Sequence, residues 1–118
     1  MLIATFDKNL SMEHKESFSQ LINGDKPVLV DFFATWCGPC KMMQPVLVEL
    51  SDRMGDKVKI IKIDVDKNPA VAMQYRVQGV PTFMLFKSGK VLWQQAGAMP
   101  IHQLENVINR LALQGQPA

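Results

Sequence analysis

Cys37 and Cys40 are the residues whose type and spacing point most directly to chemistry, and they are the only cysteines in the chain. Cysteines at positions i and i+3 at the start of a helix lie close enough to form a reversible disulfide. The pair directly follows the apolar run 28–33, which predicts a strand, and it opens an expected helix. This context is typical of a redox-active Cys-x-x-Cys site.

The same position predicts different roles for the two thiols. Unpaired amides and the helix dipole at a helix N-terminus stabilise a thiolate, so the pKa of Cys37 should fall. Cys40 lies one turn deeper and is expected to be more buried and less acidic. We therefore expect Cys37 to attack a disulfide and Cys40 to resolve the mixed disulfide that forms.

Two other uses of a cysteine pair are less consistent with this sequence. A disulfide that closes so short a loop removes only about 2 kcal/mol of unfolded-state entropy, and it would not persist in a reducing cytoplasm. Zinc requires three or four protein ligands, and His14 and His102 do not stand at ligand spacing. We expect neither a structural staple nor a metal site, and no cofactor other than the redox-active disulfide.

Strands and helices alternate along the chain. Apolar runs predict strands at 2–6, 28–33, 58–65, 82–86 and 91–96, the last two joined as a hairpin. Helical spacing and capping residues predict helices from Ser11 to about 23, at 37–54, at 68–75, and after Pro100. The order βαβαβαββα implies a layered α/β fold with a mixed sheet. We expect one domain over 1–113 and a flexible tail over 114–118.

The composition limits the class of protein. The 118 residues carry a net charge of +2, and 47% of them are hydrophobic, which suits one globular domain. The charge balance gives no reason to expect nucleic acid or an anionic membrane as a partner. The first ten residues lack the pattern of a signal peptide, so the cytoplasm is the expected location.

Several motifs around the cysteine pair resemble the thioredoxin family in order and spacing, over about residues 2–113. They are VDFFATWCGPCK (30–41), DVDKNP (64–69), VPT (80–82), FKSG (86–89) and AGA (96–98). The resemblance implies a thioredoxin fold, with a central mixed sheet flanked by helices on both faces. Phe33 and Thr35 depart from the residues frequent in the family, which affects the expected partners more than the reaction.

The resemblance also implies roles around the cysteines. Gly38 and Pro39 are typical of a reductant. Asp31 matches a buried aspartate whose raised pKa suits a proton acceptor for Cys40, and Lys62 matches the lysine beside it, unless it is only a solvated strand residue.

The docking surface is implied in the same way. Pro81 matches a cis-proline beside the cysteines, and the backbone of Val80 could pair with an extended target segment. Gly97 matches a glycine that keeps this surface open, although it could be only a bulge. Trp36 would cover the motif and touch the target, unless it serves packing alone.

The expected function is a protein-disulfide reductase, recharged with electrons from NADPH through thioredoxin reductase, with disulfide-containing proteins as substrates. Two alternatives remain. One is an exported disulfide oxidase or isomerase, and the other is a non-catalytic binding subunit that uses the fold as a clamp.

Overall fold

Six strands form one mixed sheet in the computed structural model, which describes residues 3–6, 11–14 and 17–113. The spatial order is β2-β1-β4-β3-β5-β6, with β3 and β4 parallel and the other neighbours antiparallel. The expected mixed sheet is therefore confirmed. The strands are β1 (Ile3–Phe6), β2 (Ser11–His14), β3 (Val28–Phe33), β4 (Lys59–Asp64), β5 (Thr82–Lys87) and β6 (Lys90–Ala96).

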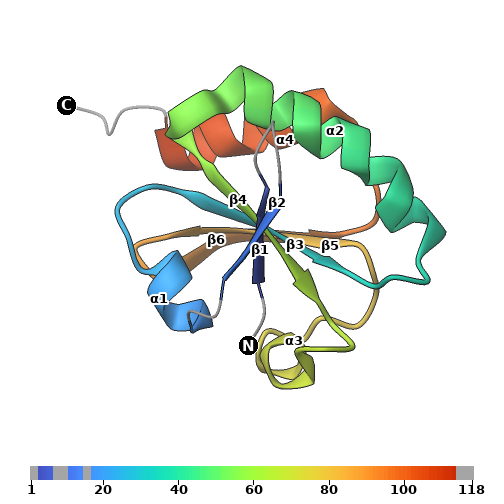
Figure 1. Ribbon diagram of the computed structural model, residues 1–118. Coiled ribbons are helices and arrows are strands. Elements are labelled where there is room, and N and C mark those ends of the chain that lie inside the picture. The colour runs from blue at the N-terminus through green and yellow to red at the C-terminus, as the bar shows by residue number, and fades with distance from the viewer. Residues whose placement is uncertain (1–2, 7–10, 15–16, 114–118) are drawn as a thin grey trace.

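Helices cover both faces of this sheet, as Figure 1 shows. The long helix α2 (Gly38–Met54) and α4 (Ile101–Ile108) lie on one face, and α1 (Phe18–Ile22) and α3 (Pro69–Gln74) lie on the other. A short 3₁₀ turn, η1 (Gly55–Lys57), follows α2, and a π-helical turn, η2 (Asn109–Leu113), follows α4. The three-layer arrangement that the resemblance implies is thus present.

Side chains from the central strands enter two separate cores, because successive residues of a strand point to opposite faces. In β3, Leu29 packs with the α2 and α4 side chains, whereas Val28, Val30 and Phe32 pack with those of α1. Asp31 belongs to the same face as Leu29 by this alternation. The strand therefore directs one carboxyl group into the layer beneath α2.

The start of the first helix was predicted wrongly. We expected Ser11 to cap a helix running to about residue 23, but residues 11–14 form β2, and α1 begins only at Phe18. Ser17 is the N-cap: its side chain accepts a hydrogen bond from the amide of Gln20, whose side chain bonds back to the Ser17 amide. This reciprocal capping box satisfies two helix-end donors and places the helix start at Ser17.

Other boundaries agree more closely with the expectation. Helix α2 begins after Cys37 and ends at Gly55, whose φ of 55° favours glycine. Asn68 precedes α3 but makes no side-chain capping bond; its amide group donates to the backbone carbonyl of Asp64. The expected tail over 114–118 lies outside the described residues.

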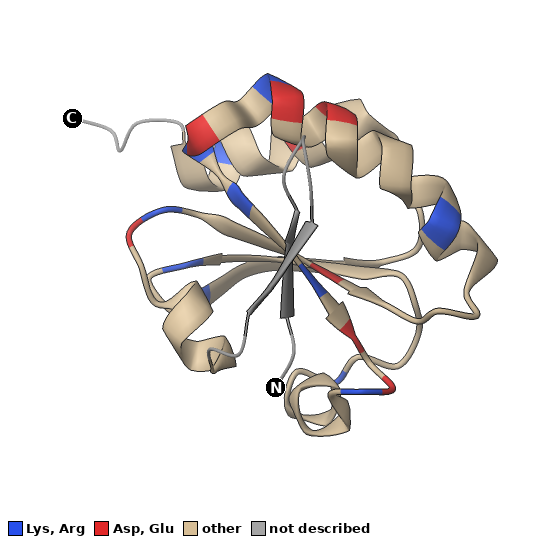
Figure 2. Ribbon diagram, in the orientation of Figure 1, with Lys and Arg blue, Asp and Glu red and all other residues tan. Residues whose placement is uncertain are grey.

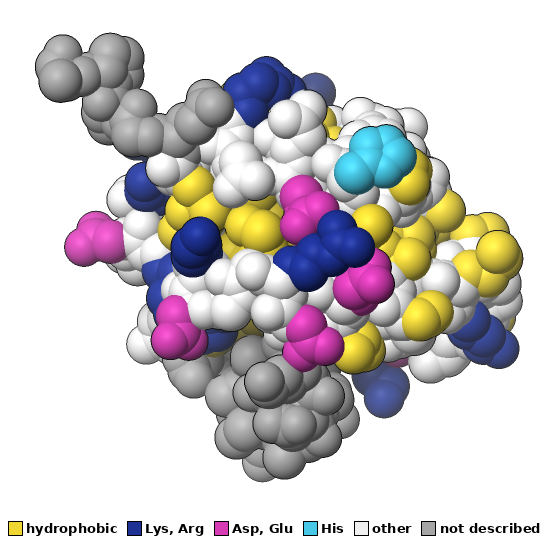
Figure 3. Space-filling model, turned by 90° about the horizontal axis from the view of Figure 1, so that it is seen from above, with side chains coloured by type: hydrophobic (Ala, Val, Ile, Leu, Met, Phe, Trp, Pro, Cys, Tyr) yellow, Lys and Arg dark blue, Asp and Glu magenta, His cyan; other side chains and the backbone are white. Residues whose placement is uncertain are grey.

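Charged residues are distributed over helices, strands and loops and mix both signs (Figure 2). The face over α2 and α4 also carries acidic and basic side chains next to one another (Figure 3). There Arg53 bonds Glu49 of its own helix and Glu105 of α4. Within the part of the chain that the structure describes, no helix has both the length and the apolar character of a membrane span.

Candidate active site

Cys37 and Cys40 form a disulfide, with their Cα atoms 5.3 Å apart. The bond lies where β3 ends and α2 begins, so the expected strand–disulfide–helix order is confirmed. The two residues between the cysteines, Gly38 and Pro39, form the exposed first positions of α2. Proline suits this position, because its missing N–H would have no partner in the helix.

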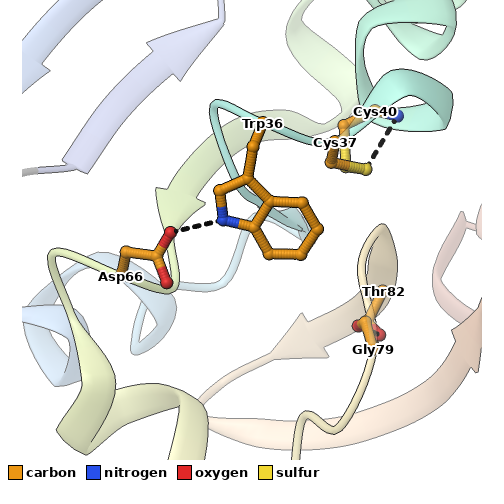
Figure 4. The surroundings of a disulfide bond; sticks show 6 residues. All are labelled: Trp36, Cys37, Cys40, Asp66, Gly79 and Thr82. Carbon is orange, nitrogen blue, oxygen red and sulfur yellow. Dashed lines mark hydrogen bonds between the residues drawn. A yellow bond between two sulfur atoms is a disulfide. The ribbon is translucent and has the colours of Figure 1, made fainter.

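Cys37 occupies the N-cap position of α2, which is 17 residues long. Its Sγ accepts a hydrogen bond from the backbone N–H of Cys40, with 3.1 Å between the two atoms (Figure 4). This N–H is one of the donors that a helix leaves without an internal partner. A sulfur atom therefore takes the place that a serine or aspartate oxygen takes in an ordinary N-cap.

The two cysteines are equally buried in the disulfide form, with 3% of Cys37 and 2% of Cys40 exposed. We expected Cys40 to be more buried than Cys37, but the exposed fractions of the two residues are nearly the same. Their positions do differ, because Cys37 caps the helix and Cys40 lies within its first turn. Ala34 completes this small buried cluster, and Phe33, Val65 and Val80 pack against it from the sides.

Trp36 lies beside the disulfide with 69% of its surface exposed. Its indole Nε1 donates a hydrogen bond of 2.8 Å to Oδ2 of Asp66, which fixes the direction of the ring (Figure 4). Asp66 lies within the motif at 64–69, and the sequence alone predicted no role for it. The available signal is topological: Trp36 follows β3 and Asp66 follows β4, and neighbouring parallel strands end at the same edge of a sheet.

The loop before β5 contacts the buried cysteine cluster through Val80. The bond between Val80 and Pro81 is cis, as the resemblance implies. Thr82 Oγ1 donates to the carbonyl of Gly79, and the Gly97 amide donates to the carbonyl of Pro81 at 2.8 Å. These bonds hold the loop, the start of β5 and the end of β6 together.

Gly97 and Gly38 both leave open space beside the backbone. A Cβ atom added at either position would meet no heavy atom within 4 Å. Gly97 also has a φ of 102°, which side-chain-bearing residues rarely adopt. This geometry matches the expected open surface at Gly97, which adjoins Pro81 through its backbone bond.

Asp31 is fully buried on β3, and neither of its carboxylate oxygens has a hydrogen-bond partner among the described residues. Burial raises the pKa of Asp31 to about 7, although the positive charge of Lys62 opposes the rise. Burial also lowers the pKa of Lys62, and the Asp31 charge opposes that change. The two residues are register partners in β3 and β4, so the structure brings them together as expected.

A comparison with known protein families matches residues 9–110 to the thioredoxin family model. The chain belongs to the thioredoxin family. Its Cys-Gly-Pro-Cys pair and its layered fold agree with that assignment.

Individual thioredoxins are similar over most of this chain. "Thioredoxin" from Alicyclobacillus acidocaldarius is 51% identical over 89 residues, which cover 75% of this chain and 85% of that protein. The structure titled "Crystal Structure of Mitochondrial Thioredoxin 3 from Saccharomyces cerevisiae (oxidized form)" is 40% identical, with a TM-score of 0.71. The match covers 78% of this chain and 86% of the yeast chain.

A chloroplast relative is longer than the matched region. "Thioredoxin Y, chloroplastic" from Oryza sativa is 48% identical over 89 residues, which cover 75% of this chain. The match spans only 53% of that relative's length.

The thioredoxin site described above is built from sulfur, carboxyl and aromatic groups. The described residues contain no cluster of three or more His, Cys, Asp or Glu side chains that could hold a metal ion. The groups that the structure places at this site include the Cys37–Cys40 pair, the buried Asp31 carboxyl and the Lys62 ammonium.

Proposed function

We propose that this thioredoxin-family chain is a protein-disulfide reductase that acts by dithiol–disulfide exchange. One observation carries the proposal: the Cys37 sulfur caps α2 and accepts the hydrogen bond of the Cys40 amide. In the reduced protein the same amide and the positive end of the helix dipole stabilise a thiolate at Cys37. A thiolate is the form of cysteine that attacks a disulfide.

The reaction proceeds in two exchanges. The Cys37 thiolate attacks one sulfur of the target disulfide, forms a mixed disulfide and releases the other target sulfur as a thiolate. Cys40 then loses its proton and attacks Cys37, which releases the second target sulfur and leaves the Cys37–Cys40 disulfide. The target gains two electrons and two protons, and the enzyme loses them.

Asp31 is the proposed acceptor of the Cys40 proton, directly or through water. Its pKa of about 7 leaves it partly ionised at neutral pH, so it can both take up and release a proton there. Lys62 favours the ionised form of this carboxyl. The Asp31 carboxyl lies in the layer beneath α2 and has no hydrogen-bond partner among the described residues, which supports this role.

The proposed docking surface surrounds the disulfide. It consists of exposed Trp36, Gly38 and Pro39, the partly exposed Val80 and Gly97, and Pro81 behind them. An extended target segment would pair with the backbone of Val80, and the open space at Gly97 would leave room for it.

Electrons for the next cycle are proposed to come from NADPH through thioredoxin reductase, in the cytoplasm. Proteins that contain a disulfide are the proposed substrates. The names of the Alicyclobacillus and yeast relatives support the thioredoxin-type reaction, whereas the words mitochondrial and chloroplastic in the names of two relatives leave the compartment to be tested.

Insulin reduction tests the proposal. The wild-type chain, supplied with NADPH and thioredoxin reductase, should reduce insulin disulfides, and Cys37→Ser should abolish turnover. Cys40→Ser should instead accumulate a covalent mixed disulfide, because the resolving thiol is absent. Turnover by Cys37→Ser, or failure of Cys40→Ser to trap a target, would contradict the proposed division of labour.

A further inference from the structure

The ammonium group of Lys62 lies over the aromatic face of Phe33, with 4.4 Å between Nζ and the ring centroid. A cation at this position is attracted by the negative face of the ring. Lys62 therefore interacts with two groups of β3: with the ring of Phe33 and, through its charge, with the carboxyl group of Asp31.

Sheet geometry explains how one lysine reaches both groups. Asp31 and Phe33 are two residues apart in β3, so their side chains leave the same face. Lys62 is the register partner of Asp31 in the parallel strand β4. Its ammonium extends past Asp31 toward the ends of the strands, where Phe33 lies, and this is also the direction of the disulfide.

Phe33 also contacts the redox centre. It is partly buried and packs against the cluster of Ala34, Cys37 and Cys40. The Phe33 ring therefore contacts both the buried cysteine cluster and the Lys62 ammonium group.

We propose that Phe33 is a positioning residue of the redox reaction. Its ring holds the Lys62 ammonium within reach of Asp31 and so sets how readily the Asp31 carboxyl takes up the proton of Cys40. The inference rests on the proposed reductase function for its kinetic consequence, whereas the positioning itself can be measured without any turnover.

Few other charges face this pair. On the same face of β4, Asp64 accepts hydrogen bonds from the amides of Asp66 and Lys67. The β5 neighbour of Asp31 is Phe83, and the sequence of β1 contains no ionisable residue. The buried side chains of α2 and α4 on this face are uncharged: Cys40, Met43, Leu47, Leu50, Met54, Leu104, Val107 and Ile108. Among the described residues, Lys62 is therefore the cation whose charge favours the ionised form of Asp31, against the larger effect of burial.

Titration of the Asp31 carboxyl carbon by NMR in the oxidised full chain tests the positioning. In Phe33→Leu the ring face is lost and the ammonium moves toward solvent. The midpoint of Asp31 should then rise by about half a pH unit, in keeping with a weak cation–ring contact. Phe33→Trp supplies a stronger ring face, and its midpoint should stay at or below that of the wild type.

The matched control is a double-mutant cycle with Lys62→Met. If Phe33 acts through the lysine, Phe33→Leu should leave the Asp31 midpoint unchanged once Lys62 is methionine. An equal rise in both backgrounds would mean that Phe33 acts only through packing, and it would overturn the proposal. So would an unchanged midpoint in the single variant Phe33→Leu.

The kinetic consequence has a distinct pH profile. A rise of half a pH unit lowers the ionised fraction of Asp31 at pH 7 from about one half to about one quarter, so resolution by Cys40 should slow about twofold. The difference should vanish well above pH 8, where Asp31 is ionised in both proteins. If the double-mutant cycle of Asp31 midpoints gives the expected result but the protein does not reduce insulin at all, the reductase function is contradicted and the positioning by Phe33 still stands.

Discussion

At the scale of single residues, Asp31 is the side chain whose burial has the clearest energetic consequence. It is fully buried without a hydrogen-bond partner among the described residues, and its pKa rises from 3.8 to about 7. The folded protein therefore binds this proton more tightly than the unfolded chain does. Between these two pH values the unfolded chain releases the proton first, and ionisation increasingly favours unfolding.

The variant Asp31→Asn should consequently gain stability relative to the wild type as the pH rises. Well below the unfolded-state pKa of 3.8, Asp31 is protonated in both states and contributes no difference, and at pH 4 the difference is still small. By pH 8 ionisation of Asp31 should have lowered the free energy of unfolding of the wild type by up to about 4 kcal/mol, and Asp31→Asn should not show this decrease. Urea unfolding of the oxidised proteins at pH 4 and pH 8 measures this change.

The same comparison has a clear contrary outcome. A stability difference that is the same at both pH values would show that Asp31 titrates normally in the folded protein. Stopped-flow reduction by the same variant should show slow resolution, since Cys40 would lack its proposed proton acceptor, and an unchanged rate would remove Asp31 from the proposed mechanism.

At the scale of elements, the sequence predicted the buried strands well and the polar ends of the first helix less well. The strands that became β3 and β5 are almost wholly apolar, which is the pattern of a strand covered on both faces. Residues 11–14 carry no such pattern, and they form β2 through backbone pairing with β1. Ser17 and Gln20 have the spacing of a capping box in the sequence, a more specific signal for a helix start than the lone Ser11.

Ser17→Ala should destabilise the protein by about 1 kcal/mol, because α1 loses the side chain that accepts the Gln20 amide. Ser11→Ala is the matched control, since residue 11 lies in β2 and its replacement removes no helix cap. Chemical denaturation of the two variants measures the difference. A larger loss at Ser11 than at Ser17 would contradict the observed helix start.

The end of α3 provides a second prediction at this scale. Arg76 is exposed directly after the cap residue Tyr75 and has a φ of 56°, a conformation that glycine adopts more easily. Arg76→Gly should therefore stabilise the chain by about 0.5–1 kcal/mol, after the greater freedom of the unfolded glycine chain is deducted.

The opposite change at Gly55 serves as its control. Gly55 has the same positive φ with open space around it, so Gly55→Ala should destabilise through backbone strain alone. Thermal unfolding of the two variants measures the expected stabilisation by Arg76→Gly and the expected destabilisation by Gly55→Ala. Destabilisation by Arg76→Gly would mean that the arginine side chain contributes more than its backbone strain costs.

At the scale of the whole molecule, the hydrophobic periodicity of the sequence did not predict the contacts between side chains that are distant in the chain. The sequence indicated which faces are apolar and where the disulfide stands. The bond from Trp36 to Asp66 and the contact of Lys62 with Phe33 depend on which strands are neighbours. Neither pattern nor propensity encodes that pairing directly, and both contacts lie at the end of the sheet that carries the disulfide.

Two connections between α2 and α4 allow a last prediction, because one is exposed and the other buried. Arg53 bonds Glu105 and Glu49 at the surface, and such exposed pairs contribute little. Leu104 is fully buried between α4 and the sheet. Arg53→Met should cost less than about 1 kcal/mol, and high salt should remove that cost. Leu104→Ala should cost about 2–5 kcal/mol at any salt concentration, because it leaves a cavity. Urea unfolding at low and high salt separates the two cases, and a salt-independent loss of several kcal/mol in Arg53→Met would show that the surface pairs, and not the apolar layer, hold these helices together.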